Sequence, residues 1–308
     1  MSTADQQDFR ELVNRAMADP ALASMRPAVE KELLHYDVLF ALDKERLLDE
    51  LVFQGGTSLR LCHGANRFSE DLDFVGGATF TSAKLAEIKD CIEHYIGERY
   101  QLDVSVKEPS SLRQGEGRGD VTVDKWQISI ATTPERKDLP NQRIKLEVAN
   151  IEALSATSLP LRRNYDFLPD GYEDILMSVE SLDEIMADKL VSLPATEKYV
   201  RHRDVWDLAW LTQHSAQLDV EMVESKVAAY GVDDYQAKVE AMIKRLPEIV
   251  VSKAFHDEMT RFLPSTVIER TLSRNGFTDY LSNTVSGLLS NVGDQLRGQP
   301  TPGSSFSM

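Results

Sequence analysis

The sequence predicts an α+β fold, in which a mixed β-sheet with helices is followed by a mostly α-helical C-terminal region. Up to about residue 180, segments that alternate between apolar and polar residues are mixed with segments of helical spacing. From Ser181 onward, almost every segment has the three- and four-residue apolar spacing of an amphipathic helix. We therefore predict a sheet domain with N-terminal helices over residues 1–180, a helical domain over 181–296 and a disordered tail over 297–308.

The elements follow in this order. In the sheet domain we predict helices at 8–18, 27–49 and 81–99, strands at 51–53, 71–75, 101–107, 121–133, 142–151 and 173–180, and a flexible polar loop at 108–120. Pro27 suits the first position of its helix. In the helical domain we predict helices at 181–193, 203–214, 219–229, 233–246, 249–261, 266–273 and 277–296.

The composition is that of an ordinary globular protein. The chain has 308 residues, of which 42% are hydrophobic and 27% charged. No run approaches the roughly 20 apolar residues of a membrane helix, and the N-terminus lacks a basic region followed by an apolar stretch, so we expect a cytoplasmic protein without membrane contact. The two cysteines, Cys62 and Cys91, do not suggest a disulfide framework, and buried or half-buried thiols explain them better than a zinc site.

The charge balance restricts the partners. With 34 basic and 50 acidic residues the net charge is −16, whereas proteins that coat nucleic acid usually have a basic excess. Any RNA substrate must therefore be held by a local basic patch. One compact cluster comprises Lys198, Arg201, His202 and Arg203. A looser group, for which a solvated face is the favoured interpretation, comprises Arg113, Arg118, Arg136, Lys137, Arg143 and Lys145.

Two aspartates provide the strongest functional signal. Side chains alternate along a strand, so Asp71 and Asp73 point to one side while Leu72 and Phe74 point into the core. Adjacent carboxylates repel each other unless a cation lies between them, and hard oxygen ligands in this arrangement suit Mg²⁺ carrying the phosphates of a nucleotide. The alternative is an acidic surface turn, which the glycine turn upstream makes less favourable.

That glycine turn, Gly-Gly-Thr-Ser, occupies residues 55–58 between the first two predicted strands. Glycine allows the backbone to approach a phosphate closely and to point its amides at it. Ser58, near the start of the following short helix, adds a hydroxyl donor at the positive end of a helix dipole. The turn therefore predicts a phosphate-binding element next to the two aspartates.

A capping box at residues 181–184 predicts the start of a helix, and Lys189 lies within the apolar stripe of that helix. At about 100° per residue, Lys189 falls near the middle of the stripe formed by Leu182, Ile185, Met186, Leu190 and Leu193. Lysine is seldom buried unless its charge is matched, so we expect a carboxylate or a phosphate beside it. The alternative is a side chain that covers apolar surface and keeps its ammonium group in water.

The following helix carries Asp204 between Leu208 and Leu211 on the helical wheel. Asp204 is either an acid that the helix dipole favours in the first turn, or the partner of Lys189. Asp207 lies at the edge of the same face and can share that role.

Four motifs together resemble a known family. The glycine turn with Asp-x-Asp is similar to motif I of the polymerase-β-like nucleotidyltransferase fold. More narrowly, the chain resembles the AbiEii/AbiGii-type nucleotidyltransferase toxins over about residues 50–215. The resemblance rests on Gly-Gly-Thr-Ser-Leu at 55–59, Arg-x-Ser-x-Asp-Leu-Asp-Phe at 67–74, Glu-x-x-Ala-x-Lys-Leu at 184–190 and Arg-Asp-x-x-Asp-Leu at 203–208.

The resemblance implies an enzyme that transfers a nucleoside monophosphate from an NTP to an acceptor hydroxyl with Mg²⁺ or Mn²⁺. It implies Asp71, Asp73 and Glu147 as metal ligands and catalytic residues, joined by Lys189 and Asp204. Glu147 shares a polar strand face with Arg143 and Lys145, and the alternative is an exposed glutamate paired with Lys145. The implied nucleotide-binding residues are Gly55, Gly56, Thr57, Ser58, Arg67, Ser69, Lys189, Arg203 and Asp207.

The same resemblance implies the toxin of a toxin–antitoxin pair that serves phage defence by abortive infection. The expected acceptor is the 3′ end of tRNA, whose modification blocks translation and growth, and a cognate antitoxin is expected from a neighbouring gene. Two other functions stay open. One is a nucleotidyltransferase for a small molecule such as an antibiotic, or for a protein side chain; the other is a non-catalytic nucleotide-binding module.

Overall fold

The computed structural model describes residues 8–114, 121–136 and 138–298. It divides into two compact units, residues 1–180 and 181–308, which are described in turn. Most of the predicted tail over 297–308 and, from the looser basic group, Arg118 and Lys137 lie outside the described residues.

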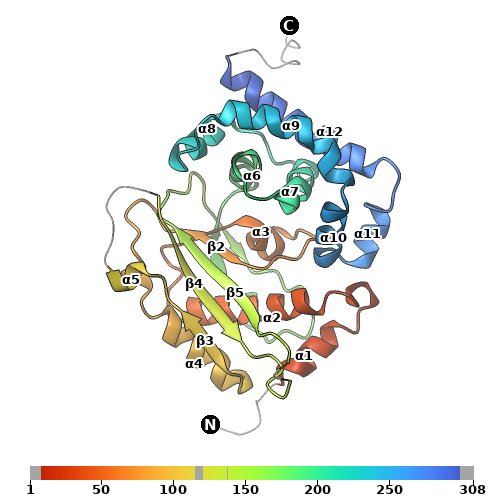
Figure 1. The fold of residues 1–308 in the computed structure, drawn as a ribbon. Helices are drawn as coiled ribbons and strands as arrows, with labels where there is room; N and C mark the ends of the chain where they lie inside the picture. The colour runs from red at the N-terminus through yellow and green to blue at the C-terminus, as the bar shows by residue number, and fades with distance from the viewer. Residues whose placement is uncertain (1–7, 115–120, 137, 299–308) are drawn as a thin grey trace. The chain divides into compact units, whose positions relative to one another are not determined.

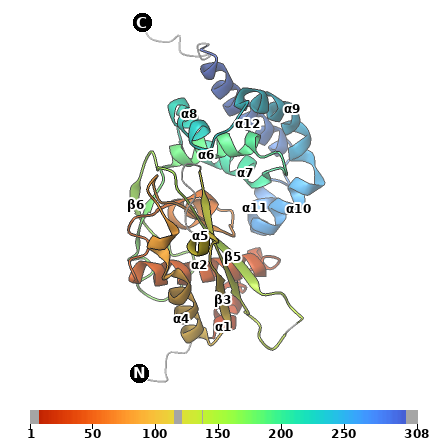
Figure 2. The same ribbon diagram turned by 60° about the vertical axis from the view of Figure 1, so that its left-hand side comes forward.

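The first unit is built on a seven-stranded mixed sheet with the strand order β3-β4-β5-β2-β1-β7-β6 (Figures 1 and 2). Strand β2 runs parallel to β5 and antiparallel to β1, and β4 runs antiparallel to β3 and β5. The strands are β1 (Val52–Gln54), β2 (Leu72–Val75), β3 (Val104–Lys107), β4 (Val123–Ile130), β5 (Gln142–Ala149), β6 (Thr157–Pro160) and β7 (Leu176–Val179). The predicted α+β class is confirmed.

The sheet is accompanied by helices and short helical turns. They are α1 (Phe9–Ala16), η1 (Pro20–Leu22), α2 (Arg26–Lys44), α3 (Gly55–Ser58), the π-helical turn η2 (Leu59–His63), η3 (Ser82–Leu85), α4 (Ile88–Tyr100) and α5 (Ser111–Gln114). Helix α2 packs against β5, and α4 packs against β3 and α2 (Figure 2). Trp126, Ile128, Ile144 and Leu146 are fully buried on the covered face, while the alternate positions of β4 and β5 are more exposed.

The structure corrects several predicted boundaries in this unit. The helix predicted at 27–49 ends at Lys44, because Arg46 adopts a left-handed backbone with φ of 59°. The predicted 81–99 helix is divided into η3 and α4, and α5 occupies part of the predicted loop at 108–120. Strand β6 was not predicted, since Thr-Ser-Leu-Pro has no apolar alternation and reads as a loop; a proline is acceptable there because β6 lies at the sheet edge. Cys62 is buried and Cys91 half-buried, as predicted.

The second unit is helical throughout its described residues. Its helices are α6 (Leu182–Ala195), α7 (His202–Gln213), α8 (Val220–Ala229), α9 (Tyr235–Val251), α10 (Lys253–Phe262), α11 (Ser265–Arg270) and α12 (Phe277–Leu296). Helix α6 contacts α7, α8 and α9, and α9 lies beside α12 (Figure 1). Among the described residues, none of the helices combines the length and the apolar character that a membrane crossing requires.

One helix boundary in this unit was wrongly predicted. Two separate helices were predicted at 233–246 and 249–261, whereas α9 continues through Pro247 to Val251. The chain breaks instead at Ser252, which is extended and whose side chain accepts a hydrogen bond from the Phe255 amide at 3.1 Å. A proline removes only one intrahelical hydrogen bond, whereas a capped extended residue ends the helix.

Candidate active site

The glycine turn forms the start of α3 rather than a loop before a helix. Gly55 has a left-handed backbone, with φ of +76°, and a Cβ atom there would lie 3.0 Å from Oδ2 of Asp73. A Cβ atom on Gly56 would lie 2.6 Å from Nη2 of Arg67 and 2.9 Å from Oγ of Ser69. The left-handed backbone of Gly55 favours glycine, and a Cβ atom on Gly56 would displace the Arg67 guanidinium or the Ser69 hydroxyl. The turn therefore brings five of the predicted site residues together.

The two hydroxyl residues of the turn are buried. The Thr57 hydroxyl donates to the carbonyl of Asp71, and the Ser58 hydroxyl donates to the carbonyl of Gly55 at 2.9 Å. Thr57 is 1% exposed and Ser58 0% exposed. Both side chains therefore stabilise the shape of the turn, and neither hydroxyl points outward as a phosphate donor, contrary to the predicted arrangement for Ser58.

The strand register sets the carboxylates in one row across the sheet. Asp73 of β2 is paired with Gln54 of β1 and with Glu147 of β5, and Glu147 is in turn paired with Lys125 of β4. Paired residues of neighbouring strands point to the same face at about 5 Å spacing. The sheet itself therefore brings the third predicted carboxylate beside the Asp-x-Asp pair.

Two lysines neutralise these acids. Lys125 Nζ lies 3.0 Å from Oε1 of Glu147, and Lys145 Nζ lies 3.5 Å from Oδ2 of Asp71. The backbone amide of Lys145 also donates to Oδ1 of Asp71 at 3.3 Å, and the charge of Asp71 raises the pKa of Lys145. The alternative pairing of Glu147 with Lys145 is wrong, because the β4 lysine occupies that place.

This arrangement fits a divalent cation. The donor set consists of carboxylate oxygens from Asp71, Asp73 and Glu147, which are the hard ligands that Mg²⁺ and Mn²⁺ prefer. Asp71 and Glu147 each contact a flexible, exposed lysine, so positive charge already balances them in this structure. Both lysine ammonium groups can move away without breaking the sheet.

The second unit holds a buried lysine between two acids. Lys189 Nζ, on α6, lies 2.9 Å from Oδ1 of Asp204 and 2.8 Å from Oδ2 of Asp207, both on α7. The three residues are 6%, 3% and 2% exposed. The predicted pairing of Lys189 with Asp204 and Asp207 is confirmed, and the alternative in which the Lys189 ammonium reaches water is wrong.

Asp204 is the centre of this group. It also accepts hydrogen bonds from the Ser192 hydroxyl at 3.0 Å and from Arg201. Burial alone would raise the pKa of Asp204, but the charges of Lys189 and Arg201 hold it well below its usual value. The carboxylate therefore stays ionised, and it fixes the position of the lysine ammonium group.

Three residues of the compact basic cluster, Arg201, His202 and Arg203, line an open pocket of about 740 Å³ in the second unit. Residues 199–204 form one wall, and residues of α9 and α10 form the rest. Glu258 lies 2.9 Å from Nδ1 of His202 and 3.3 Å from Nε of Arg203. The predicted nucleotide ligand Arg203 is thus paired with an acid, and the pocket carries charges of both signs.

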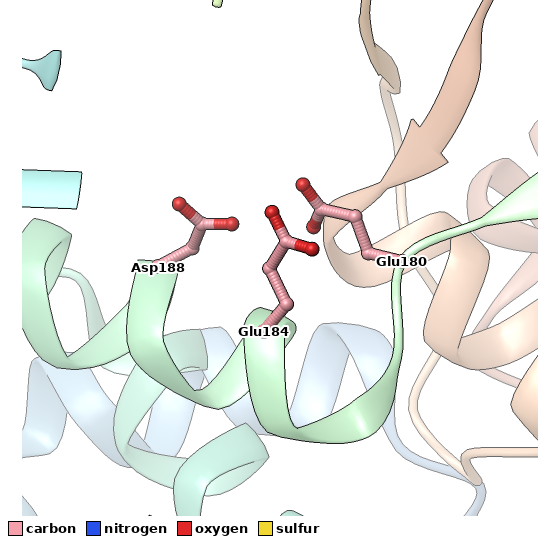
Figure 3. A group of neighbouring side chains, drawn as sticks. All are labelled: Glu180, Glu184 and Asp188. Carbon is pink, nitrogen blue, oxygen red and sulfur yellow. The ribbon is translucent and has the colours of Figure 1, made fainter. Parts of the chain in front are cut away.

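A further acidic group had not been predicted. Three acids spaced four residues apart, Glu180, Glu184 and Asp188, follow one another along the chain as it enters α6 (Figure 3). Lys226 of α8, which is 1% exposed, lies 2.6 Å from Glu184 and 3.0 Å from Asp188. A buried lysine thus balances the two α6 acids and ties α6 to α8, so we do not assign this group as a metal site.

Two residues of the charged network were missed in the sequence. Lys125 alternates onto the polar face of its strand, but its partner depends on the register between β4 and β5. Lys226 follows Val223 by three residues on α8, and this lysine within an apolar stripe is the same signal that identified Lys189. The same criterion, a lysine within an apolar helical stripe, would have identified Lys226.

Comparison with one solved structure supports the fold. MenT4, a nucleotidyltransferase toxin from Mycobacterium tuberculosis, matches with a TM-score of 0.54 and 19% identity over 92% of this chain and 90% of that chain. JHP933 from Helicobacter pylori matches with a TM-score of 0.42 and 18% identity over 88% of this chain and 94% of that chain. At these identities the likeness to MenT4 concerns the fold alone.

Among curated proteins, the E3 ubiquitin-protein ligase BRE1 of Yarrowia lipolytica is 26% identical over 206 residues, which is 61% of this chain. The chain spans only 27% of that relative's length.

The family assignment comes from a sequence profile. The profile described as nucleotidyl transferase AbiEii toxin, type IV TA system, matches residues 37–283, which is most of the chain. This match confirms the resemblance drawn from the four motifs and the prediction of a nucleotidyltransferase enzyme. The chain belongs to the AbiEii nucleotidyl transferase toxin family of type IV toxin–antitoxin systems.

Proposed function

We propose that this toxin transfers a nucleoside monophosphate from an NTP to the hydroxyl at the 3′ end of tRNA, and so blocks translation and growth. The observation that carries the proposal is the row of carboxylates from Asp73 to Glu147, set directly against the glycine turn. An anionic row beside a phosphate-binding turn suits a reaction in which charge develops on phosphate oxygens.

In this reaction the acceptor oxygen attacks the α-phosphorus of the NTP, the bond to the β-phosphate oxygen breaks, and pyrophosphate leaves. Glu147 accepts the proton of the acceptor hydroxyl. Gly55 and Gly56 let the backbone approach the phosphates, and the Arg67 guanidinium beside Gly56 contributes positive charge there. The Thr57 and Ser58 hydroxyls hold the shape of the turn, and Ser69, whose Oγ lies beside Gly56, contacts the phosphates in this proposal.

Asp71, Asp73 and Glu147 would hold a divalent cation, Mg²⁺ or Mn²⁺. When bound, the cation supplies neutralisation of the phosphate charge and polarises the reacting phosphoryl group. Lys125 and Lys145 contact the same acids in this structure, so the affinity for the cation depends on how readily these lysines give way.

The role of the Lys189 group in catalysis stays a prediction from the family resemblance. Its chemistry suits the role, because a lysine ammonium fixed by two ionised carboxylates is a rigid point charge for a phosphate. We propose that Lys189, Asp204, Asp207 and Arg203 serve the nucleotide in this way. A cognate antitoxin is the partner that a type IV system implies.

One observation favours a second acceptor class. The net charge of −16 suits a cationic small molecule, such as an aminoglycoside antibiotic, better than it suits an RNA. The transfer assay that tests the activity also distinguishes a tRNA acceptor from a small-molecule acceptor.

The test is incubation of the purified protein with each α-labelled NTP, Mg²⁺ and total tRNA, with wild type compared to Asp73→Asn and Lys189→Met. Label on tRNA that both substitutions abolish supports the proposal. Label only on a small molecule or on protein supports the second acceptor class. Nucleotide binding without label transfer under any condition contradicts both.

A further inference from the structure

One face of the sheet carries a concentration of positive charge beside the carboxylate row. Across β3, β4 and β5 the register pairs Lys107 with Gln127 and Gln127 with Lys145. The neighbouring row contains Lys125 and Glu147, and the next pairs Ser129 with Arg143. Paired residues point to the same face, so four cations share one surface.

These four cations are exposed. The Lys125 and Lys145 side chains are 54% and 47% exposed, and Lys107 and Arg143 are also exposed. Within the described part of the chain, neither Lys107 nor Arg143 forms an ion pair. On the same face of these three strands, all of whose residues are described, Glu147 is the single acid.

This surface, the cationic face, is unusual for the chain. The protein as a whole has 50 acidic against 34 basic residues, so four cations against one acid on β3, β4 and β5 depart from the average balance, and Asp71 meets Lys145 at the margin of this area. The acid is itself a predicted metal ligand. The positive charge therefore begins at the candidate active site and extends from it across β4 and β5 to the edge strand β3.

The spacing suits a chain of phosphates. Same-face residues of one strand are roughly 7 Å apart, and neighbouring strands lie about 5 Å apart. Lys145 and Arg143 follow each other along β5, and Lys107 lies two strands away at the edge. The remaining side chains on this face include Ser105, Gln127 and Ser129. These are neutral groups that can donate hydrogen bonds to phosphate and sugar oxygens.

We propose that the cationic face binds the phosphodiester backbone of an RNA acceptor and delivers its end to the carboxylates of the same sheet. The inference rests on the proposed function, because it assigns the acceptor a place. It also explains how a protein of net charge −16 binds a polyanion, because binding requires a local basic patch and not a basic net charge. The contacts would be to backbone phosphates, so binding is independent of base sequence.

The experiment measures binding without catalysis. Fluorescently labelled total tRNA is titrated with protein in EDTA and without NTP, at a series of KCl concentrations. The test variant is Lys107→Gln/Arg143→Gln, which touches no predicted metal ligand. The matched control is Lys244→Gln/Arg270→Gln, an exposed lysine and arginine of the second unit, and thermal unfolding verifies that both variants are folded.

We expect the test variant to bind tRNA on the order of tenfold more weakly near physiological salt. The slope of log affinity against log salt should become less steep by roughly 1.5, because each lost phosphate contact removes about 0.7–0.9. Each single substitution should produce about half of that change. In the transfer assay the test variant should raise KM for tRNA and keep kcat at saturating tRNA.

Two results would overturn the inference. In the first, the test variant and the control have the same affinity and the same salt slope. In the second, wild-type protein does not bind tRNA even at low salt. If label is nevertheless transferred to a small molecule or a protein, nucleotidyl transfer stands and only the RNA surface is refuted.

Discussion

Replacement of Gly55 by alanine tests whether the glycine turn positions the catalytic carboxylate. The added methyl group would lie 3.0 Å from Oδ2 of Asp73, which is tighter than nine in ten real Cβ contacts, so the carboxylate must shift by a few tenths of an ångström. Alanine at φ of +76° also costs about 1–2 kcal/mol of backbone strain, which corresponds to a Tm lower by roughly 2–8 °C in a domain of this size. Since misplacement of a reacting group by about 1 Å costs on the order of 100-fold in rate, this smaller shift should cost roughly 3- to 10-fold.

The matched control is Gly276→Ala. Gly276 has φ of +80°, and a Cβ atom there would meet no neighbouring atom within 4 Å, so its alanine carries the backbone strain without the clash. We expect both variants to lose similar stability in thermal unfolding, and only Gly55→Ala to lose transfer of label from NTP, by roughly 3- to 10-fold. Equal activity of the two variants would refute the idea that close contact between the turn and Asp73 positions the carboxylate.

Three further outcomes are expected. Lys226→Met should lower the free energy of unfolding by about 3–5 kcal/mol in urea titrations, since it leaves the buried charge of Glu184 without its cation, whereas Lys244→Met should change it little. Burial lowers the pKa of His35 from 6.5 to about 4, so on acidification the unfolded chain takes up a proton at a higher pH than the folded protein does. The free energy of unfolding should therefore fall by about 3 kcal/mol as the pH drops from 6.5 to 4 in EDTA, and His35→Gln should lack this component. Asp73→Asn should abolish transfer and leave the Tm equal or higher, because it relieves repulsion within the carboxylate row; a large loss of Tm would contradict the metal-ligand assignment.

Much of the candidate site could be predicted from local pattern. Period-two alternation placed Asp71 and Asp73 on one face of a strand and Glu147 on the polar face of another. Helical periodicity identified Lys189 as a cation in an apolar stripe, and the pairing with Asp204 and Asp207 follows because a buried ammonium group needs anions. The orientation of each side chain depends only on residues within two turns or a few strand positions of it, whereas the pairing between α6 and α7 follows from the need of a buried charge for a partner.

Other features depended on the register between distant segments. Lys125 meets Glu147 because β4 and β5 pair in one particular alignment, which nothing within either strand specifies. The cationic face likewise exists only because three strands bring Lys107, Arg143 and Lys145 to one surface. The edge strand β6 escaped prediction because its sequence lacks alternation and its backbone is held by β7 alone.

The sequence by itself determined the family, the fold class and the residue types of the site, since local periodicity and motif spacing are properties of the chain. Tertiary structure alone decided how the side chains are used. It turned the Ser58 hydroxyl inward to the Gly55 carbonyl, set Lys125 and Lys145 against the carboxylates, and carried α9 through Pro247. The physical reason is competition between possible partners. Each polar group could bind any of several acceptors or counter-ions in the chain, and only packing and strand register determine which of them lies close enough.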